Sequence, residues 1–427
     1  MQDLQDFAHT AVPENEGPRF KWLYLTNVEA AVAVCVPVFM FGATLGQSLS
    51  MMNLLIALVI GGGVLSIISG YSSYIGVKTR LSTALLVKES FGAQGAKIVW
   101  LILACASFGW FGLQTEVFAK ALIALIGKIS PTLELNNTLI IILSGFLMSS
   151  TAVIGIKGVG KLAQLSMPLL LGVLIYALSM ALAAKGYMSW WNYTPANPMQ
   201  LGTAIASIIG AYAIGAIIMP NVKRFAKNKS HSISSAVLAL GVFYPILLLL
   251  TAATAYLMKE PDFIELLLNF GLGWLTMIIL LLATWTTNDI NLYGASLALA
   301  PVFPKIKRNI LTAIAGTVGT AIACFGIFEN MTALFMILGV LTTPLFIIYC
   351  IDFKMRKFST RVKAVSVHWT AFAAWILSSS IGIWTTPADQ WGMEMTTITT
   401  VPALDSLLAA VVIYPIILWA SKIKKSL

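Results

Sequence analysis

Charged residues are scarce in this chain: only 10% of its 427 residues are Asp, Glu, Lys or Arg, and 58% are apolar. Ordinary soluble domains have about 25% charged and about 45–50% apolar residues, so this composition excludes a soluble surface. The chain is nevertheless basic, with a formal net charge of +10. A nucleic-acid-binding protein needs a polar surface to carry its basic patch, which excludes that partner. The sequence predicts a polytopic protein surrounded by a lipid bilayer.

Residues that catalyse reactions or bind metals are also scarce. The chain has three His and four Cys residues, and it contains neither a His-Glu-x-x-His nor a Gly-x-Ser-x-Gly motif. All four cysteines stand in apolar segments, where a thiol packs as a small hydrophobic group. The sequence therefore indicates no disulfide framework, no enzyme and no bound cofactor.

What the chain has in abundance is long apolar runs. A helix needs about 20 apolar residues to cross a bilayer core about 30 Å thick. Twelve segments meet this requirement, so the sequence predicts an all-α membrane protein with twelve transmembrane helices. The predicted spans are Thr26–Ser48, Asn53–Ile75, Ile98–Ile126, Thr138–Ile156, Leu162–Ala183, Gly202–Met219, Ile233–Met258, Leu272–Leu299, Ile310–Ile327, Met331–Ile351, His368–Trp384 and Val401–Ala420.

The positive charges lie mostly on one side of these spans. If the spans alternate in direction, all but four of the 27 Lys and Arg residues fall in connections on the same side. Because basic residues are retained in the cytoplasm, both termini are predicted to be cytoplasmic, in a protein of the cytoplasmic (inner) membrane. Residues 1–25 have no apolar core and indicate a cytosolic tail rather than a signal peptide. Residues 421–427 are predicted to form a second tail.

Two spans carry helix-breaking residues at matching positions. Pro37 removes an amide donor and clashes with the preceding turn, which predicts a kink or break near residues 33–37. Span six is predicted to be interrupted by a similar group, Gly210, Gly215 and Pro220. These spans begin two groups of five, the pattern of inverted repeats with a binding site at the midplane. The predicted parts are a first repeat at 26–183, a second repeat at 200–351 and two further helices at 368–420.

Charged side chains inside a span are costly and are therefore candidates for function. Glu116 and Lys120 stand four residues apart on one helix stripe. This spacing predicts either an ion pair near the outer end of span three or a part in gating or proton coupling. Glu29 lies in the first turns of span one, where a carboxylate suits the positive end of the helix dipole, so we expect it to cap that helix.

Asp289 lies in a polar stretch, residues 284–291, of an otherwise apolar span. Lipid cannot satisfy these groups, so they must face protein or a watery cavity. Thr286 and Thr287 offer hydroxyl oxygens suited to a cation such as Na+, and Asn288 offers the donor and acceptor that recognise an amide or heterocycle edge. Hydrogen bonding between helices is the structural alternative. Seven of these eight residues are polar or can form hydrogen bonds, which is more than hydrogen bonding between helices requires. We therefore predict that this stretch binds a ligand or an ion.

A second group of candidates, Ser107, Trp110 and Gln114, lies at positions i, i+3 and i+7 on one stripe of span three. A tryptophan face beside a glutamine amide can stack a flat ring and hydrogen-bond its edge. The pattern alone also fits a tryptophan that packs or anchors at the interface. The polar groups cluster at one depth and no loop could hold a signalling domain, which disfavours a channel or a sensor.

Four motifs spread over most of the chain are recognisable: Gly109-Trp110-Phe111-Gly112, Val222-Lys223-Arg224-Phe225, Trp285-Thr286-Thr287-Asn288-Asp289 and Ile351-Asp352. With them the chain resembles the first nucleobase–cation symporter family, most closely the cytosine permease branch. The resemblance implies a LeuT-like fold of five-plus-five inverted repeats with two further C-terminal helices. It also implies a secondary-active importer that works by alternating access.

The resemblance implies roles for residues of both candidate groups. Trp110 and Tyr212 would sandwich a flat base, with Gln114 and Asn288 on its polar edges and Ser107 on the same stripe. Main-chain groups at the break in span one would also contact the base, those of Cys35 and Val36. The implied Na+ ligands are the hydroxyls of Thr286 and Thr287 and the main-chain carbonyls of Ala283, Ala31 and Val34.

The substrate stays open at this point. Cytosine permeases carry a glutamine where Ser107 stands, whereas Gln114 resembles the hydantoin, allantoin and purine branches. We expect an importer of a cytosine-like pyrimidine or a purine, coupled to Na+. The alternative is a proton-coupled carrier of hydantoin, allantoin or a thiamine-precursor pyrimidine. The expected partners are this small molecule, Na+ or H+ and the lipid bilayer, and we expect a monomer.

Overall fold

The computed structural model describes residues 11–13, 17–154, 159–185, 191–258, 264, 273–355 and 366–426. Regular structure in this part of the chain is helical, apart from one isolated β-bridge between Phe20 and Ala226. Residues 1–10 and 14–16 of the predicted N-terminal tail lie outside the described residues, as do residues 155–156 and 272 at the ends of two predicted spans.

Each of the twelve predicted spans coincides with a helix or with consecutive helices. Two short helices, Thr83–Phe91 and Pro220–Lys223, and the 3-10 turn Ala388–Gln390 lie outside the predicted spans. The long helices begin and end within a few residues of the predicted spans. In chain order the helices are α1 (Trp22–Ala33), α2 (Val36–Ser48), α3 (Met51–Thr79), α4 (Thr83–Phe91), α5 (Gly95–Ile129), α6 (Asn137–Ile154), α7 (Val159–Lys185), α9 (Leu201–Ile217), α10 (Pro220–Lys223), α11 (Lys229–Ala236), a π-helical segment (Val237–Phe243), α12 (Tyr244–Met258), α14 (Gly273–Leu299), α15 (Arg308–Cys324), α16 (Met331–Met355), α17 (Trp369–Thr385), a 3-10 turn (Ala388–Gln390) and α18 (Pro402–Ser426).

The helices are suited to a membrane in length and in surface. Among the described residues, seven helices are long and apolar enough to cross a bilayer, or eight if α1 and α2 count as one bent span. Large apolar side chains are exposed on their outer faces, among them Ile129, Phe146 and Ile154. Lipid suits such a surface and water does not. The structure thus confirms an all-helical, multi-pass membrane protein.

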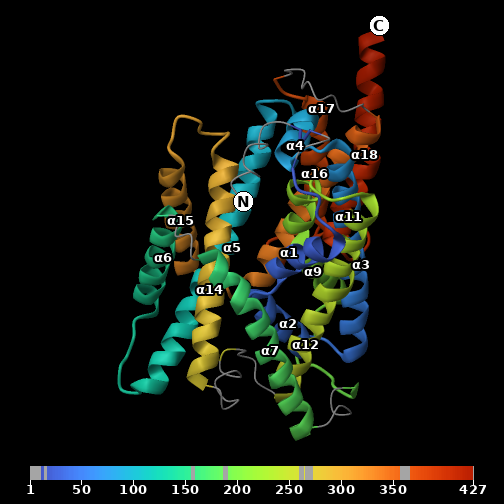
Figure 1. Ribbon diagram of the computed structural model, residues 1–427. Coiled ribbons are helices and arrows are strands. Elements are labelled where there is room, and N and C mark those ends of the chain that lie inside the picture. Colours follow the sequence, from blue (N-terminus) through green and yellow to red (C-terminus); the bar gives the residue numbers. More distant parts are fainter. Residues whose placement is uncertain are drawn as a thin grey trace.

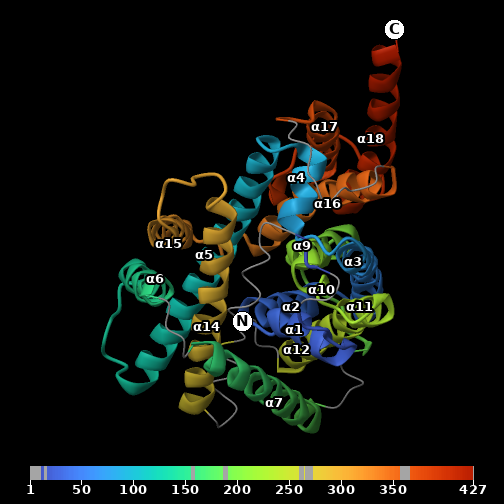
Figure 2. The same cartoon turned by 45° about the horizontal axis from the view of Figure 1, so that its top comes forward.

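The helices form two groups that lie side by side (Figures 1 and 2). In the first group, which we call the bundle, α2 packs on α12, α3 packs on α9 and α11, and α1 packs on α11. In the second group, the scaffold, α5 packs on α14 and α15, and α15 packs on α6. Helix α7 contacts both α12 and α14, and α16 packs along α9. Figure 2 shows α7 crossing from one group toward the other.

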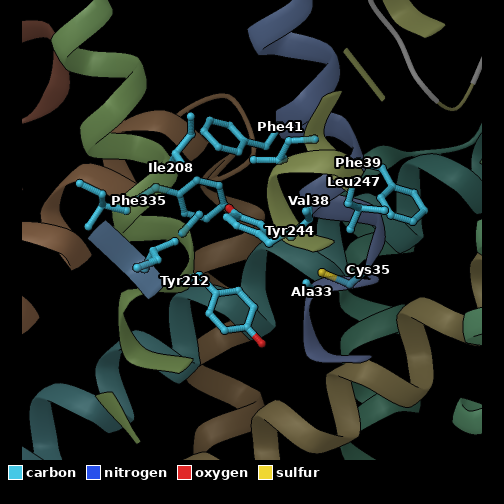
Figure 3. Packing of buried hydrophobic residues seen from close by; sticks show 14 of the residues in the cluster. Ala33, Cys35, Val38, Phe39, Phe41, Ile208, Tyr212, Tyr244, Leu247 and Phe335 are labelled. Atoms are coloured by element: carbon cyan, nitrogen blue, oxygen red, sulfur yellow. The ribbon is translucent and has the colours of Figure 1, made fainter. Parts of the chain in front are cut away.

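Span one is broken, as predicted. α1 ends at Ala33, α2 begins at Val36, and the two helices meet at an angle of 70°. Cys35 between them is extended, with φ −142° and ψ 156°. Pro37 occupies the first turn of α2, where its missing amide hydrogen costs no helical bond. The largest buried hydrophobic cluster surrounds this break (Figure 3).

Span six is not interrupted at its glycines, contrary to the prediction. α9 continues through Gly210 and Gly215, and the chain turns only after this helix, before α10 begins at Pro220. The glycines serve close packing instead. A Cβ on Gly210 would lie 1.7 Å from the main-chain oxygen of Phe335, so the backbones of α9 and α16 touch there. A Cβ on Gly215 would lie 2.5 Å from the ring of Tyr212, which folds over this position.

Candidate substrate and ion site

Gln114 on α5 is a buried amide without a full set of partners. Its side chain is 1% exposed, and its Oε1 has no hydrogen-bond partner among the described residues. Leaving such an acceptor unpaired costs about 1–3 kcal/mol, so each case calls for an explanation. A ligand that donates a hydrogen bond supplies one. The position of Gln114 therefore fits the predicted contact with the polar edge of a base.

Trp110, one turn before Gln114, offers a flat aromatic face. Its half-buried ring stacks on Phe335 of α16, with ring centroids 5.0 Å apart and planes inclined by 26°. The family resemblance implies that Trp110 and Tyr212 sandwich a base, and in the structure Phe335 stacks directly on Trp110. Phe335 was missed because one phenylalanine among 21 in an apolar chain carries no signal of its own. The structure thus adds an aromatic ring from a different helix, which lies against one face of Trp110.

The side chain of Tyr212 on α9 is buried inside the bundle. Its ring lies beside that of Tyr244 of α12, with centroids 5.4 Å apart, and its hydroxyl donates a hydrogen bond to the main-chain oxygen of Glu29 in α1. Figure 3 shows both tyrosines near Cys35 at the break of span one. Tyr212 therefore connects α9 to α1, and its sandwich with Trp110 around a base stays a prediction.

Ser107 and Asn288 lie where α5 meets α14. The Oγ of Ser107 donates to its own helix, at the carbonyl of Leu103 over 3.0 Å. The fully buried amide of Asn288 donates to the carbonyl of Phe111 and to the hydroxyl of Thr115, each over 3.1 Å. Asn288 thus joins the two scaffold helices, the role that the sequence had weighed as hydrogen bonding between helices. Its predicted contact with a base is not tested by these bonds.

The predicted ion ligands on α14 lie together. The hydroxyls of Thr286 and Thr287 both donate to the main-chain oxygen of Ala283, over 3.0 and 2.8 Å. A hydroxyl oxygen keeps its lone pairs when it donates, so these three oxygens form a cluster that suits a hard cation. The other two predicted ligands stand at the break of span one. There the carbonyl of Ala31 accepts a hydrogen bond from the amide of Val34, over 3.3 Å.

The break in span one places two opposite helix ends next to each other. α1 ends in carbonyl groups with partial negative charge, and α2 begins with amide groups of partial positive charge. A cation suits the first end, and an acceptor atom of a base suits the second. Cys35 and Val36, predicted to offer main-chain groups to the base, are both buried at this point. The carbonyl of Cys35 accepts from Val38 and Phe39 in the first turn of α2.

Asp289 lies on the side of α14 that faces α6. Its carboxylate accepts a hydrogen bond from the hydroxyl of Thr151 over 3.1 Å, and that hydroxyl also accepts from the indole of Trp285 over 2.9 Å. Asp289 is half-buried. The polar stretch on α14 therefore makes two separate sets of contacts. Thr286 and Thr287 bond to Ala283 within α14, and Asp289 joins α14 to α6.

The predicted ion pair of Glu116 and Lys120 is present. The two side chains are 3.3 Å apart, and Glu116 also accepts the main-chain amide of Phe328 over 2.8 Å. The ammonium of Lys120 lies 3.9 Å from the centroid of the Phe328 ring. The pair thereby holds the turn between α15 and α16 against α5.

The expectation that Glu29 caps its helix is wrong. Glu29 is the eighth residue of α1, is 1% exposed and forms an ion pair with Lys223 of α10 at 2.6 Å. Lys223 had been assigned to a cytoplasmic connection, but its side chain is fully buried. Sequence reasoning missed this pair because the two residues stand 194 positions apart.

Comparison with known proteins decides the family. Residues 12–408 match the family described as permease for cytosine/purines, uracil, thiamine, allantoin. The chain belongs to this permease family. The cytosine permease of Escherichia coli (strain K12) is 28% identical to it over 390 residues, which make up 90% of each chain. The predicted family is confirmed, and membership makes the chain a transporter rather than an enzyme.

Solved structures confirm the fold of the permease. The inward-facing conformation of Mhp1 matches with a TM-score of 0.80 and 19% identity, over 97% of this chain and 95% of that one. A closed conformation of Mhp1, a nucleobase-cation-symport-1 family transporter with bromovinylhydantoin bound, matches with a TM-score of 0.76 and 19% identity. That match covers 97% of this chain and 96% of the other. The permease therefore has the fold of Mhp1.

Proposed function

We propose that this permease imports a nucleobase or a related flat heterocycle across the inner membrane together with Na+. The observation that carries the proposal is the buried, unpaired Oε1 of Gln114, one turn from the stacked rings of Trp110 and Phe335. A flat ring with donors on its edge satisfies both features. Stacking on an aromatic side chain contributes about 1–3 kcal/mol per base. The bound hydantoin of Mhp1 is a ligand of the same chemical class.

The proposed base and ion sites lie at one depth of the protein. Asn288 bonds to Phe111 and Thr115, which are the neighbours in sequence of Trp110 and Gln114. It also directly follows the threonines of the proposed ion site. The remaining base contacts in the proposal are Tyr212, Ser107 and the main chain of Cys35 and Val36. The proposed Na+ ligands are Thr286, Thr287, Ala283, Ala31 and Val34.

Both sites take residues from the bundle and from the scaffold. Thr286 and Thr287 belong to the scaffold, whereas Ala31 belongs to the bundle. Trp110 belongs to the scaffold and Tyr212 to the bundle. An ion and a base bound between the bundle and the scaffold favour one position of the bundle relative to the scaffold. Rocking of the bundle against the scaffold then gives alternating access. Each ligand must tighten the binding of the other by the same factor.

The proposal also includes the membrane topology and the oligomeric state that we expect from the sequence. These are twelve spans, two inverted repeats of five at 26–183 and 200–351, two further helices at 368–420, cytoplasmic termini and a working monomer. The coincidence of every predicted span with one or more helices supports the twelve spans. The break at the start of the first repeat supports a midplane site.

Proton coupling is the second candidate, favoured by one observation. Asp289 is half-buried between α14 and α6. Its carboxylate can take up a proton while it remains in contact with Thr151. In this version the cargo is hydantoin, allantoin or a thiamine-precursor pyrimidine.

One uptake experiment tests the proposal and separates these candidates. Cells that express the permease take up radiolabelled cytosine or hypoxanthine, with and without sodium, against a panel of unlabelled bases, hydantoins and pyrimidine vitamers. We expect sodium-dependent uptake that flat bases inhibit. Uptake that follows the proton gradient without sodium would support the second candidate. If each panel member is then labelled in turn and none is taken up, both candidates are overturned.

A further inference from the structure

The ion pair of Glu29 and Lys223 lies inside the bundle with no exposed side-chain surface. The ammonium of Lys223 also donates to the hydroxyl of Ser235 in α11 over 2.6 Å. The second carboxylate oxygen of Glu29 accepts from the hydroxyl of Ser69 in α3. Each charged group is therefore matched by a hydrogen-bonding partner as well as by its counter-ion, which a buried pair requires.

This network joins the four spans of the bundle, namely spans one, two, six and seven. Glu29 lies on α1, Ser69 on α3, Lys223 on α10 at the end of span six, and Ser235 on α11. Ser232, one turn earlier on α11, donates to the carbonyl of Ser73 in α3 over 3.1 Å. Spans one, two, six and seven are thereby connected through polar groups at one place.

Helix α1 has few other anchors. Only four of its 12 residues are buried, namely Leu25, Glu29, Ala30 and Ala33. No side chain caps its N-terminus. Leu25 is the one large apolar side chain among the four, and Trp22, Leu23 and Tyr24 are exposed. Apolar packing alone therefore holds this helix weakly, and Glu29 supplies its main polar contact with the rest of the bundle.

The position of Glu29 connects the network to the proposed sites. Glu29 stands two residues before Ala31 and five before Val34, which places it within about 8 Å of both along the helix axis. Its main-chain oxygen accepts the hydroxyl of Tyr212. A rotation of α1 about its axis would move the carbonyls at the break and the ring of Tyr212 together.

Stability alone is a weak reason for such a pair. Replacing a buried ion pair by apolar residues of similar size is often neutral or stabilising, because two charges must be removed from water. We propose that Glu29 and Lys223 are positioning residues, whose ion pair fixes the orientation of α1 and thereby of the carbonyls that bind the coupling ion. This inference rests on the proposed function and adds to it the residues that set the affinity for sodium.

The decisive variant removes both charges at once, as Glu29→Gln with Lys223→Met. It leaves no unpaired buried charge, whereas either change alone would. Purified protein in nanodiscs is titrated with sodium in the absence of base, and the rise in melting temperature reports ion binding. Binding of radiolabelled cytosine or hypoxanthine at saturating sodium reports the base site. We expect the half-saturating sodium concentration to rise about 10- to 100-fold, which is the usual effect of removing a residue that orients a metal ligand. The affinity for the base should remain nearly unchanged.

Two further variants keep the test decisive if the paired variant does not fold. Glu29→Asp and Ser69→Ala retain both charges but shift the anchor of α1, and each is expected to raise the half-saturating sodium concentration by a smaller factor. Asp405→Asn is the matched control, because it removes a buried carboxylate from the start of α18, outside the bundle. It should leave sodium binding unchanged.

The outcomes separate this inference from the proposed function. If the wild-type permease binds sodium and the folded variants bind it equally well, the positioning role is overturned and the proposed function stands. If the wild-type permease shows neither sodium binding nor sodium-dependent base binding, the proposed ion coupling fails and the inference fails with it.

Discussion

Gln114→Leu should separate stability from function in this permease. The Oε1 of Gln114 is buried without a partner among the described residues, so the folded protein without base carries a cost of about 1–3 kcal/mol. Leucine has a similar volume and no polar atom. The variant should therefore unfold at an equal or higher temperature than the wild-type protein in the absence of base.

The same change should weaken base binding. It removes the hydrogen bonds that the Gln114 amide makes to the edge of the base, worth about 1–3 kcal/mol together, which corresponds to about 5- to 150-fold in Kd. Thermal unfolding of purified protein and equilibrium binding of radiolabelled base, both at saturating sodium, measure the two effects separately.

Asn288→Leu is the comparison for stability, because this second buried amide has hydrogen-bond partners on both its nitrogen and its oxygen. It donates to Phe111 and Thr115 and accepts from Asn291 over 3.2 Å. Its loss should lower the free energy of unfolding by about 1–3 kcal/mol. If Gln114→Leu instead lowered stability and left base affinity unchanged, the assignment of Gln114 to a base site would be refuted.

Three further changes test other parts of the account. Thr286→Ala and Thr287→Ala should each raise the sodium concentration needed for half-maximal uptake, and an unchanged sodium requirement would point to proton coupling. Trp110→Ala should abolish base uptake while the protein remains in the membrane at normal amounts, as measured by immunoblot; undiminished uptake would contradict the stacking role. Gly210→Ala should destabilise the fold by about 1–3 kcal/mol, because its Cβ would lie 1.7 Å from the Phe335 oxygen. An unaltered melting temperature would show that the two helices separate freely.

Features with a local cause could be predicted from the sequence. Pro37 cannot donate an amide hydrogen to a preceding turn, which suits the start of a helix, and the break lies directly before α2, whose first turn holds Pro37. The pairing of Glu116 with Lys120 follows from helical spacing alone. The apolar runs likewise located each long helix, because most of a span must be apolar to cross the bilayer core.

Features that depend on distant neighbours could not be predicted. Gly210 indicated a break in span six, but its purpose is contact with Phe335 of α16, which no local pattern reveals. Glu29 suited a helix cap, and only the folded chain brings Lys223 to it. The one signal in the sequence that set Lys223 apart from the other basic residues was the resemblance of Val222-Lys223-Arg224-Phe225 to a family motif.

Reciprocal binding of sodium and base tests the central claim most directly. Base affinity is measured by quenching of tryptophan fluorescence at low and at saturating sodium, and sodium affinity is measured with and without saturating base. The account predicts that sodium strengthens base binding and that base strengthens sodium binding by the same factor. Base binding with the same affinity at every sodium concentration would contradict it.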